Sequence, residues 1–215
     1  MLQACSSEEE NQGIIEYSIS YPVNNFNRSY EMLLPKTMTM TYKNNVYKNE
    51  VENAMFKSIM ISDCNKKQLT MVLIYGKQLK IYTKLDEKET KTWLESFPKH
   101  EFIKSYHKEE LLGYKCDKYY GLFSDLEDGH DVEIFETQEI PIKNSNWSNQ
   151  FSQFNGVLLG YEIEQFGMNM KFTAQSFKKP KSISDDFFNV PKDCKKVSLE
   201  RFLKEMEVIF SLVIN

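Results

Sequence analysis

Two of the three histidines of this 215-residue chain, His100 and His107, are seven residues apart, a spacing close to two turns of an α-helix. Glu101, Glu109 and Glu110 are close to them in the sequence, and imidazoles and carboxylates are the usual nitrogen and oxygen ligands of zinc. The segment has few apolar residues, however, which is typical of a loop or an edge strand rather than a helix. We therefore expect two solvated histidines and no metal site.

The other groups that could do chemistry form no recognisable catalytic pattern. The acidic run from Asp125 to Asp131 contains Gly129, but its spacing lacks the alternating oxygen ligands and distal Glu of a calcium loop, so it predicts a charged hairpin tip. The glycines are isolated, which argues against a phosphate-binding loop. No Ser or Cys has the sequence context of an activated nucleophile. The sequence predicts no catalytic residue and no cofactor.

The composition is that of an ordinary globular domain. Hydrophobic residues make up 41% and charged residues 27% of the chain, and the net charge is 27 − 31 = −4. This mildly acidic balance argues against nucleic-acid binding, which uses basic surfaces. Nothing approaches eighteen consecutive apolar residues, so we expect no membrane-spanning helix. The chain is rich in Phe (15), Tyr (12) and Met (10), which favours a large sheet with a soft apolar face.

The N-terminal segment predicts a lipid anchor. The run Leu2-Gln3-Ala4-Cys5 resembles the end of a bacterial lipoprotein signal peptide, whose Cys receives the lipid. The polar residues that follow bury nothing, so we expect residues 1–12 to be a lipid-anchor tether after a truncated signal peptide. The acidic residues after Cys5 resemble an export signal for surface lipoproteins. The expected location is the bacterial envelope, anchored to the outer membrane on its periplasmic or surface side. A stray Cys near a frayed terminus is the alternative.

The remaining cysteines are Cys64, Cys116 and Cys194, an odd number. An oxidising compartment would permit one disulfide among three possible pairings, and three free thiols are an equal alternative. The sequence has no CxxC spacing, which argues against a zinc or thioredoxin-type site.

Alternating polarity predicts about ten strands joined by short polar turns. The expected strands are residues 13–21, 36–43, 46–53, 54–63, 67–75, 78–85, 111–123, 130–137, 156–166 and 168–177, with a short piece near 184–190. Helices are expected at 86–97, where Asp86 can cap the first turn, and at 198–214, where Ser198 can do so. Residues 144–154 carry aromatic side chains at helical spacing.

Five segments in order carry a family resemblance: Gly113–Tyr119, Val132–Thr137, Leu159–Glu164, Gly167–Ala174 and Ile183–Pro191. They are similar to an uncharacterised family of bacterial envelope lipoproteins, catalogued as a domain of unknown function. The resemblance is strong across residues 111–192 and weaker across 13–85, and it does not cover the segment after Cys194. It implies a LolA/LolB-like fold, an incomplete antiparallel barrel around helices with an apolar cavity. It implies no activity and no catalytic residue.

The predicted fold is therefore mainly β (α+β): a curved antiparallel sheet or incomplete β-barrel of about ten strands, with two or three helices on its concave side. Residues 13–215 would form this single LolA-like domain, including the helix 198–214. A two-sheet sandwich is the alternative, but it would leave the apolar helical faces nowhere to pack. Trp93 and the C-terminal helix are the expected plugs.

Alternating apolar side chains on two expected strands are the candidate ligand site. Met38, Met40 and Tyr42 share one strand face, and Met168, Met170 and Phe172 share another. If both faces point inward, they could line a pocket for an acyl chain or another hydrophobic molecule; a filled core is the alternative.

Two functions follow from these observations. The first is a lipid-anchored envelope protein that binds a lipid or other hydrophobic small molecule without catalysis. The second is a structural or protein-interaction lipoprotein with a solid core. An enzyme ranks third, because the polar residues form no nucleophile–base pair.

Overall fold

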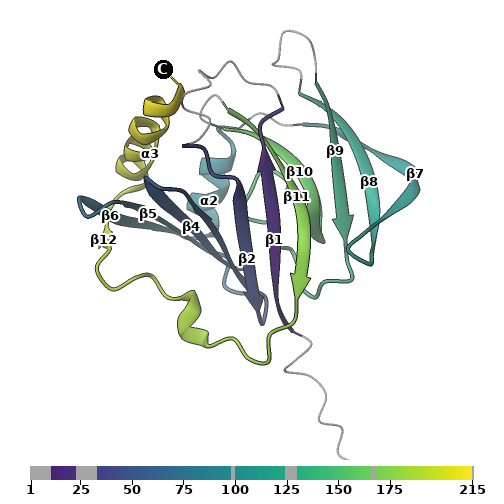
Figure 1. The fold of residues 1–215 in the computed structure, drawn as a ribbon, viewed down its shortest axis with the longest axis horizontal. Helices are drawn as coiled ribbons and strands as arrows, with labels where there is room; N and C mark the ends of the chain where they lie inside the picture. The colour runs from purple at the N-terminus through teal and green to yellow at the C-terminus, as the bar shows by residue number, and fades with distance from the viewer. Residues whose placement is uncertain (1–10, 23–32, 98–99, 124–129, 166–167, 215) are drawn as a thin grey trace, which may run out of the picture.

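The protein curls one large β-sheet around two α-helices and a long connecting segment (Figure 1). The computed structural model describes residues 11–22, 33–97, 100–123, 130–165 and 168–214. The strands described are β1 (Gln12–Ser20), β2 (Thr37–Lys43), β3 (Val46–Glu52), β4 (Phe56–Asp63), β5 (Gln68–Tyr75), β6 (Leu79–Leu85), β7 (Phe102–Leu111), β8 (Tyr114–Phe123), β9 (His130–Thr137), β10 (Val157–Gln165), β11 (Met168–Lys178) and β12 (Lys195–Lys196). The helices described are α2 (Glu87–Leu94), α3 (Leu199–Ile214) and the 3₁₀-helix η1 (Asp185–Phe188).

The strand order shows how the sheet is assembled. The order is β12-β6-β5-β4-β3-β2-β1-β11-β10-β9-β8-β7, with β12 and β7 at the two edges. All neighbours pair antiparallel except β12 and β6, which are parallel. Strands β1–β6 and β7–β11 are thus two meanders that meet where β1 pairs with β11. The connection from β6 to β7 contains α2. It must run from one edge of the sheet to the opposite edge, because β6 is next to the edge strand β12 and β7 is the other edge strand.

The main core lies on one face of the sheet, here called the concave face, because the strands alternate apolar and polar side chains. The register places Tyr17 of β1 opposite Met38 of β2, and Met38 opposite Val51 of β3. Beyond β1, Ile19 is opposite Phe172 of β11. These side chains all belong to one cluster of buried or partly buried apolar residues.

Helices α2 and α3 pack against the concave face. A capping box begins α2: the Asp86 carboxylate accepts the Glu89 amide, and the Glu89 carboxylate accepts the Asp86 amide. Trp93, near the end of α2, packs against the main core. Phe210 of α3 meets Phe56 of β4 edge-to-face, with ring centroids 5.4 Å apart. Both helices therefore fill the hollow of the sheet.

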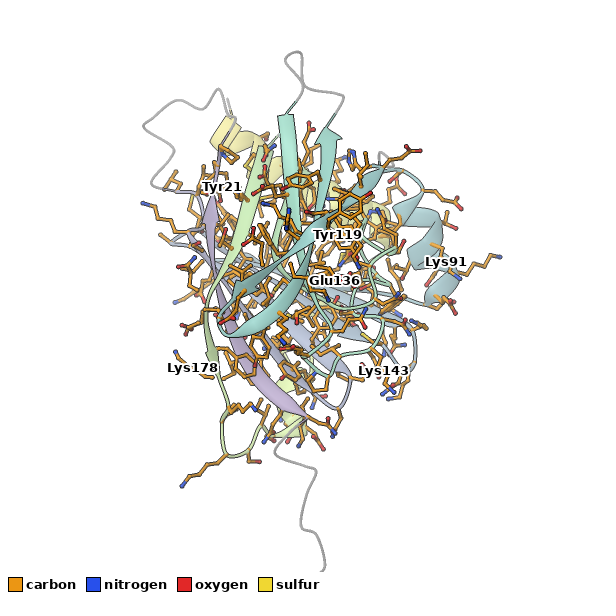
Figure 2. All side chains as sticks on the ribbon, turned by 90° about the vertical axis from the view of Figure 1, so that its right-hand side faces the viewer. Tyr21, Lys91, Tyr119, Glu136, Lys143 and Lys178 are labelled. Carbon is orange, nitrogen blue, oxygen red and sulfur yellow. The ribbon has the colours of Figure 1, made fainter. Side chains whose placement is uncertain are left out.

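The segment between β9 and β10 also enters the hollow. Its residues Ile140, Ile142 and Phe151 are buried, and the indole Nε1 of Trp147 donates to Ser62 Oγ of β4 at 2.8 Å. The buried Glu136 carboxylate, at the end of β9, accepts the backbone amides of Asn155 and Gly156 at 2.9 and 2.6 Å and the Tyr119 hydroxyl at 3.0 Å (Figure 2). One carboxylate thus fixes the end of this segment against β8.

The opposite face is partly covered by the chain after β11. Phe188, Val190 and Cys194 pack on a small cluster formed by Ile59, Ile61 and Val72 of β4 and β5. The chain then pairs with β6 as β12 and returns to the concave face as α3. The C-terminal segment therefore wraps around one edge of the sheet.

Comparison with the sequence predictions confirms a mainly β, antiparallel architecture and corrects its details. The described chain forms twelve strands in one sheet, rather than about ten, and the order rules out the two-sheet sandwich. The expected strand 111–123 is interrupted by a turn in which Leu112 and Gly113 have positive φ, and 102–111 is an edge strand. Residues 144–154 form turns instead of a helix, because their aromatic side chains anchor to the sheet. The piece near 184–190 is the 3₁₀-helix η1 rather than a strand.

Candidate functional site

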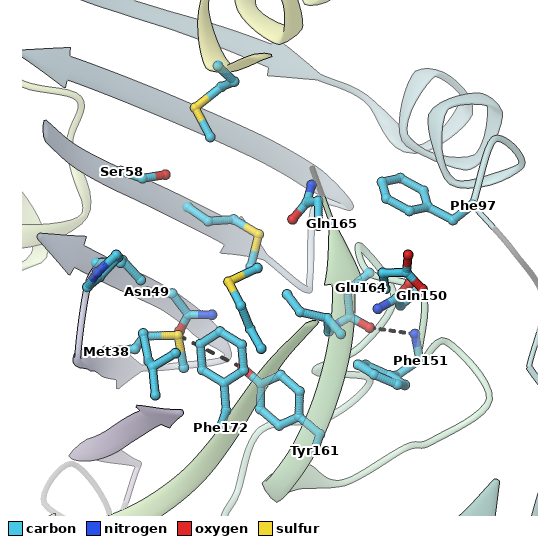
Figure 3. Close-up of a pocket in the computed structure, with 18 of the residues that line it drawn as sticks. Met38, Asn49, Ser58, Phe97, Gln150, Phe151, Tyr161, Glu164, Gln165 and Phe172 are labelled. Atoms are coloured by element: carbon cyan, nitrogen blue, oxygen red, sulfur yellow. Dashed lines mark hydrogen bonds between the residues drawn. The ribbon is translucent and has the colours of Figure 1, made fainter. Parts of the chain in front are cut away.

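An apolar cavity of about 220 Å³ lies in the hollow of the sheet (Figure 3). Its floor comes from β1–β4, β10 and β11, and its other walls come from α2, α3 and residues 148–151. The apolar and aromatic residues that line it are Ile19, Tyr21, Pro35, Met38, Val51, Phe56, Met60, Trp93, Leu94, Phe97, Phe151, Tyr161, Ile163, Met170, Phe172, Met206 and Phe210. Four of these are methionines, whose flexible side chains adapt to varied apolar shapes.

The structure divides the six predicted ligand-binding residues into three groups. Met38, Met170 and Phe172 line the cavity. Met40 lines a smaller adjoining space of about 40 Å³, which Met38 also borders. Tyr42 and Met168 are buried in the main core and do not line the larger cavity. Both strand faces thus point inward as expected, and the binding role of these side chains remains a prediction.

Aromatic and sulfur contacts shape the floor of the cavity. The rings of Tyr161 and Phe172 are stacked, with centroids 4.8 Å apart and planes 8° from parallel. The Tyr161 hydroxyl contacts Met38 Sδ at 3.9 Å, a weak hydrogen bond in which the phenol donates (Figure 3). Burial raises the pKa of Tyr161 well above its ordinary value, so the phenol is neutral at physiological pH. The part of the floor formed by Tyr161, Phe172 and Met38 therefore carries no charge.

Polar groups are few and are placed at particular points of the wall. Asn49 Oδ1 is buried and has no hydrogen-bond partner among the described residues, and Asn49 lines both the cavity and the smaller space beside it. Three polar residues lie at the side of the cavity next to Phe97, which follows α2 in the chain: Gln150, Glu164 and Gln165 (Figure 3). A ligand would meet mostly hydrocarbon, with hydrogen-bonding groups at its margins.

Several lining residues were not predicted as site residues. Trp93 and the C-terminal helix were expected only to plug the sheet, yet Trp93, Met206 and Phe210 form the roof of the cavity. Met60 of β4 was also missed, although it alternates with Phe56 and Ser58 on the inward face. That alternation was the available signal, because it repeats the pattern of Met38 and Met40.

The cysteines and histidines form no reactive constellation in the described part of the chain. Cys64, Cys116 and Cys194 are free thiols, and burial raises the pKa of both Cys64 and Cys116 to about 11. His100 and His107 are not part of any cluster of three or more metal-ligating side chains within the described residues. The acidic tip 125–131 lies mainly outside the described residues, as does Cys5.

Comparison with known proteins identifies the fold but no family. No protein-family model matches the chain, and neither does any curated protein. Two crystal structures of PNGF-II, in space groups C2 and P21, match it with a TM-score of 0.58 and 15% sequence identity. Each match covers 92% of this chain and 33% of the PNGF-II chain, so this chain spans about a third of that protein's length. At this identity, the likeness extends to the fold alone.

None of the helices in the described residues is long and apolar enough to cross a membrane.

Proposed function

We propose that this protein binds a hydrophobic small molecule, such as a lipid or an acyl chain, in the hollow of its sheet and does so without catalysis. The observation that carries the proposal is the apolar cavity of about 220 Å³, lined by methionine and aromatic side chains. An engineered apolar cavity of about 150 Å³ in another protein binds benzene, so a cavity of this size has room for a ligand.

Two further features support a ligand rather than an incompletely filled core. The walls come from six strands, two helices and a connecting segment, so the space lies where all of these elements meet. The buried Asn49 Oδ1, which has no partner among the described residues, offers a hydrogen-bond acceptor to a bound molecule. Leaving such an atom unpaired costs about 1–3 kcal/mol, which a donor on the ligand would recover.

The experiment that tests this proposal compares ligand binding by the wild-type cavity with binding by a variant whose cavity is filled. Ser58 lines the cavity, and Ser58→Phe would place a ring inside it. Thr39 lies on the opposite face of the sheet in β2, which β3 separates from β4, and provides the matched control Thr39→Phe. Native mass spectrometry of delipidated protein exposed to octanol or medium-chain lipids should detect a bound amphiphile in the wild type and in Thr39→Phe, but not in Ser58→Phe. Absence of any bound molecule in the wild type would contradict the proposal.

The proposal includes attachment to the bacterial outer membrane through a lipid on Cys5. Its support is the sequence pattern Leu2-Gln3-Ala4-Cys5. The curved sheet with helices in its hollow also supports the LolA-like architecture that the family resemblance implies. Cys5→Ala, expressed with a complete signal peptide, should release the protein from the membrane fraction. Cys194→Ala is the control and should remain in that fraction.

A protein-interaction role is the second candidate, and the edge strand β7 favours it. Ile103 and Tyr106 on β7 are 76% and 103% exposed, and Tyr120 of the paired strand β8 is 43% exposed. Exposed apolar side chains beside an unpaired strand edge are typical of contact surfaces. A photo-cross-linking residue at position 106 should capture a partner in cells if this role is correct, whereas the same residue at the exposed position 181 should not.

A further inference from the structure

A second hollow adjoins the apolar cavity. It is a groove of about 780 Å³ between the end of α2, residues 147–154 and strands β7 and β8. Five aromatic side chains line it: Phe97, Phe102, Tyr119, Trp147 and Phe154. Polar side chains, including Gln153 and Ser152, complete its walls. The groove is therefore both aromatic and polar, unlike the cavity.

The groove and the cavity share one wall. Leu94 and Phe97 from α2 and the turn after it, together with Asn149 and Gln150 from the connecting segment, line both spaces. Gln150 lies beside Phe97 at this side of the cavity (Figure 3). A mainly apolar compartment and a more polar one thus adjoin at these side chains, and a molecule with an apolar and a polar end matches this arrangement.

The two spaces set limits on each end of such a molecule. The cavity is about 1.5 times the volume of the engineered cavity that binds benzene, so it accommodates an apolar group of about eight to ten non-hydrogen atoms. The groove carries Lys91 against Glu95 and Glu101, a formal charge of 1 − 2 = −1 with His100 neutral. This balance disfavours an anionic head, and the aromatic walls suit stacking against a polar ring or contact with a cation.

We propose that the ligand is a single-chain amphiphile of about eight carbons, with its chain in the cavity and a non-anionic polar head in the groove. This inference rests on the proposed function, because it assumes that the cavity is a binding site. It adds that the head contributes to affinity and that the groove selects the charge of the head.

Calorimetric titration with four eight-carbon probes below their critical micelle concentrations tests the inference. Octanol has a minimal head, octyl glucoside a neutral one, octylphosphocholine a zwitterionic one and octanoate an anionic one. We expect at least one of octyl glucoside and octylphosphocholine to have an affinity about tenfold higher, or more, than the affinities of octanoate and octanol. Which of the two binds more tightly distinguishes a hydroxyl-rich head from a zwitterionic head that contains a quaternary ammonium.

Charge reversal in the groove provides the second measurement. Glu95 and Glu101 are exposed and line the groove but not the cavity. The double variant Glu95→Lys/Glu101→Lys should tighten octanoate binding about threefold or more and leave octanol binding unchanged. Glu110→Lys/Glu207→Lys changes the net charge equally at exposed positions outside both spaces and should leave all four affinities unchanged.

The outcomes separate the two proposals. If octanol binds in the cavity as tightly as the other probes, and the charge reversal has no effect, the cavity remains a binding site and the role of the groove is rejected. If no probe binds to the folded wild-type protein, both proposals are rejected. If the probes bind equally well to Ser58→Phe, they occupy another place, and the assignment of chain and head to these spaces is wrong.

Discussion

The Tyr47 hydroxyl donates a hydrogen bond of 2.8 Å to the carbonyl oxygen of Ser145, which is 98 residues later in the chain. Tyr47 is in β3 and 2% exposed, and Ser145 belongs to the segment that fills the hollow of the sheet. Ser148 Oγ lies 3.4 Å from the same hydroxyl and 3.0 Å from Ser62 Oγ. These buried polar residues fix the segment between β9 and β10 against the sheet, next to the cavity.

Tyr47→Phe should lower the free energy of unfolding by about 1–3 kcal/mol, because the buried carbonyl of Ser145 loses its donor. Chemical denaturation monitored by fluorescence measures the change. Tyr106→Phe removes a hydroxyl from a fully exposed side chain and should change stability by less than about 0.5 kcal/mol. Equal effects of the two substitutions would show that the Tyr47 hydrogen bond contributes nothing to stability.

Glu136→Ala should destabilise the protein by about 3 kcal/mol or more, because it leaves two backbone amides and one tyrosine hydroxyl without their shared acceptor. Glu136→Gln should cost less, since one side-chain oxygen still accepts the amides. Thermal unfolding of both variants measures this order, with the more exposed Glu133→Gln as the control. The interpretation fails if Gln is as costly as Ala.

Gly156 and Gly113 should respond differently to substitution. A Cβ at Gly156 would lie 2.3 Å from the carbonyl oxygen of Thr137, so Gly156→Ala should cost about 1–3 kcal/mol or more. Gly113 has open space around it but a φ of +81°, a conformation that Asn tolerates. Gly113→Asn should therefore cost about 1 kcal/mol or less, while Gly156→Asn should be at least as harmful as Gly156→Ala. Denaturation midpoints of the three variants test this contrast.

The thiols predict a pH dependence of stability. Burial raises the pKa of Cys64 and Cys116 from 9.0 to about 11, so the folded state holds these protons where the unfolded state releases them. Their contribution to stability is complete below pH 9 and is lost as the pH rises towards 11. Buried tyrosines such as Tyr47, whose pKa is raised to about 12, act in the same direction. Cys64→Ala should make the decline of unfolding free energy between pH 9 and 11 shallower.

Reactivity provides an independent check on the same thiols. Cys194 is only partly buried, whereas Cys64 and Cys116 are 3% and 0% exposed. Among these three thiols, a reagent at pH 8 should therefore label Cys194 first in the native protein, and the other two only in denaturant. Peptide mapping by mass spectrometry identifies the labelled positions, and rapid labelling of Cys116 in the native protein would contradict its burial.

The sequence predicted the strands well where alternation was regular. β1, β2 and β4–β6 begin and end within a few residues of the expected positions, and Asp86 caps α2 as expected. Predictions were wrong where tertiary contacts override local pattern. Trp147, Phe151 and Phe154 have helical spacing, but their segment forms turns because Ser62 and Glu136 bind its indole and its backbone.

The candidate site was predictable only in part, for a related reason. Alternation showed that Met38, Met170 and Phe172 would point to one side of their strands, because period two follows from strand geometry. It could not show that α3 and α2 would place Met206 and Trp93 opposite them. It also could not distinguish Met170, which lines the cavity, from Met168, which lies in filled core two residues away.

The central position of β1 affects how the chain can fold during synthesis. β1 emerges first and pairs on one side with β2, but its other neighbour, β11, is about 150 residues further along: Ser18, for example, contacts Thr173, 155 residues later. Until the ribosome has made β11, the edge of β1 has no native partner, and no strand pairing joins the two meanders. We expect nascent chains that end before β11 to need chaperone protection, and to become resistant to protease only when that strand has emerged.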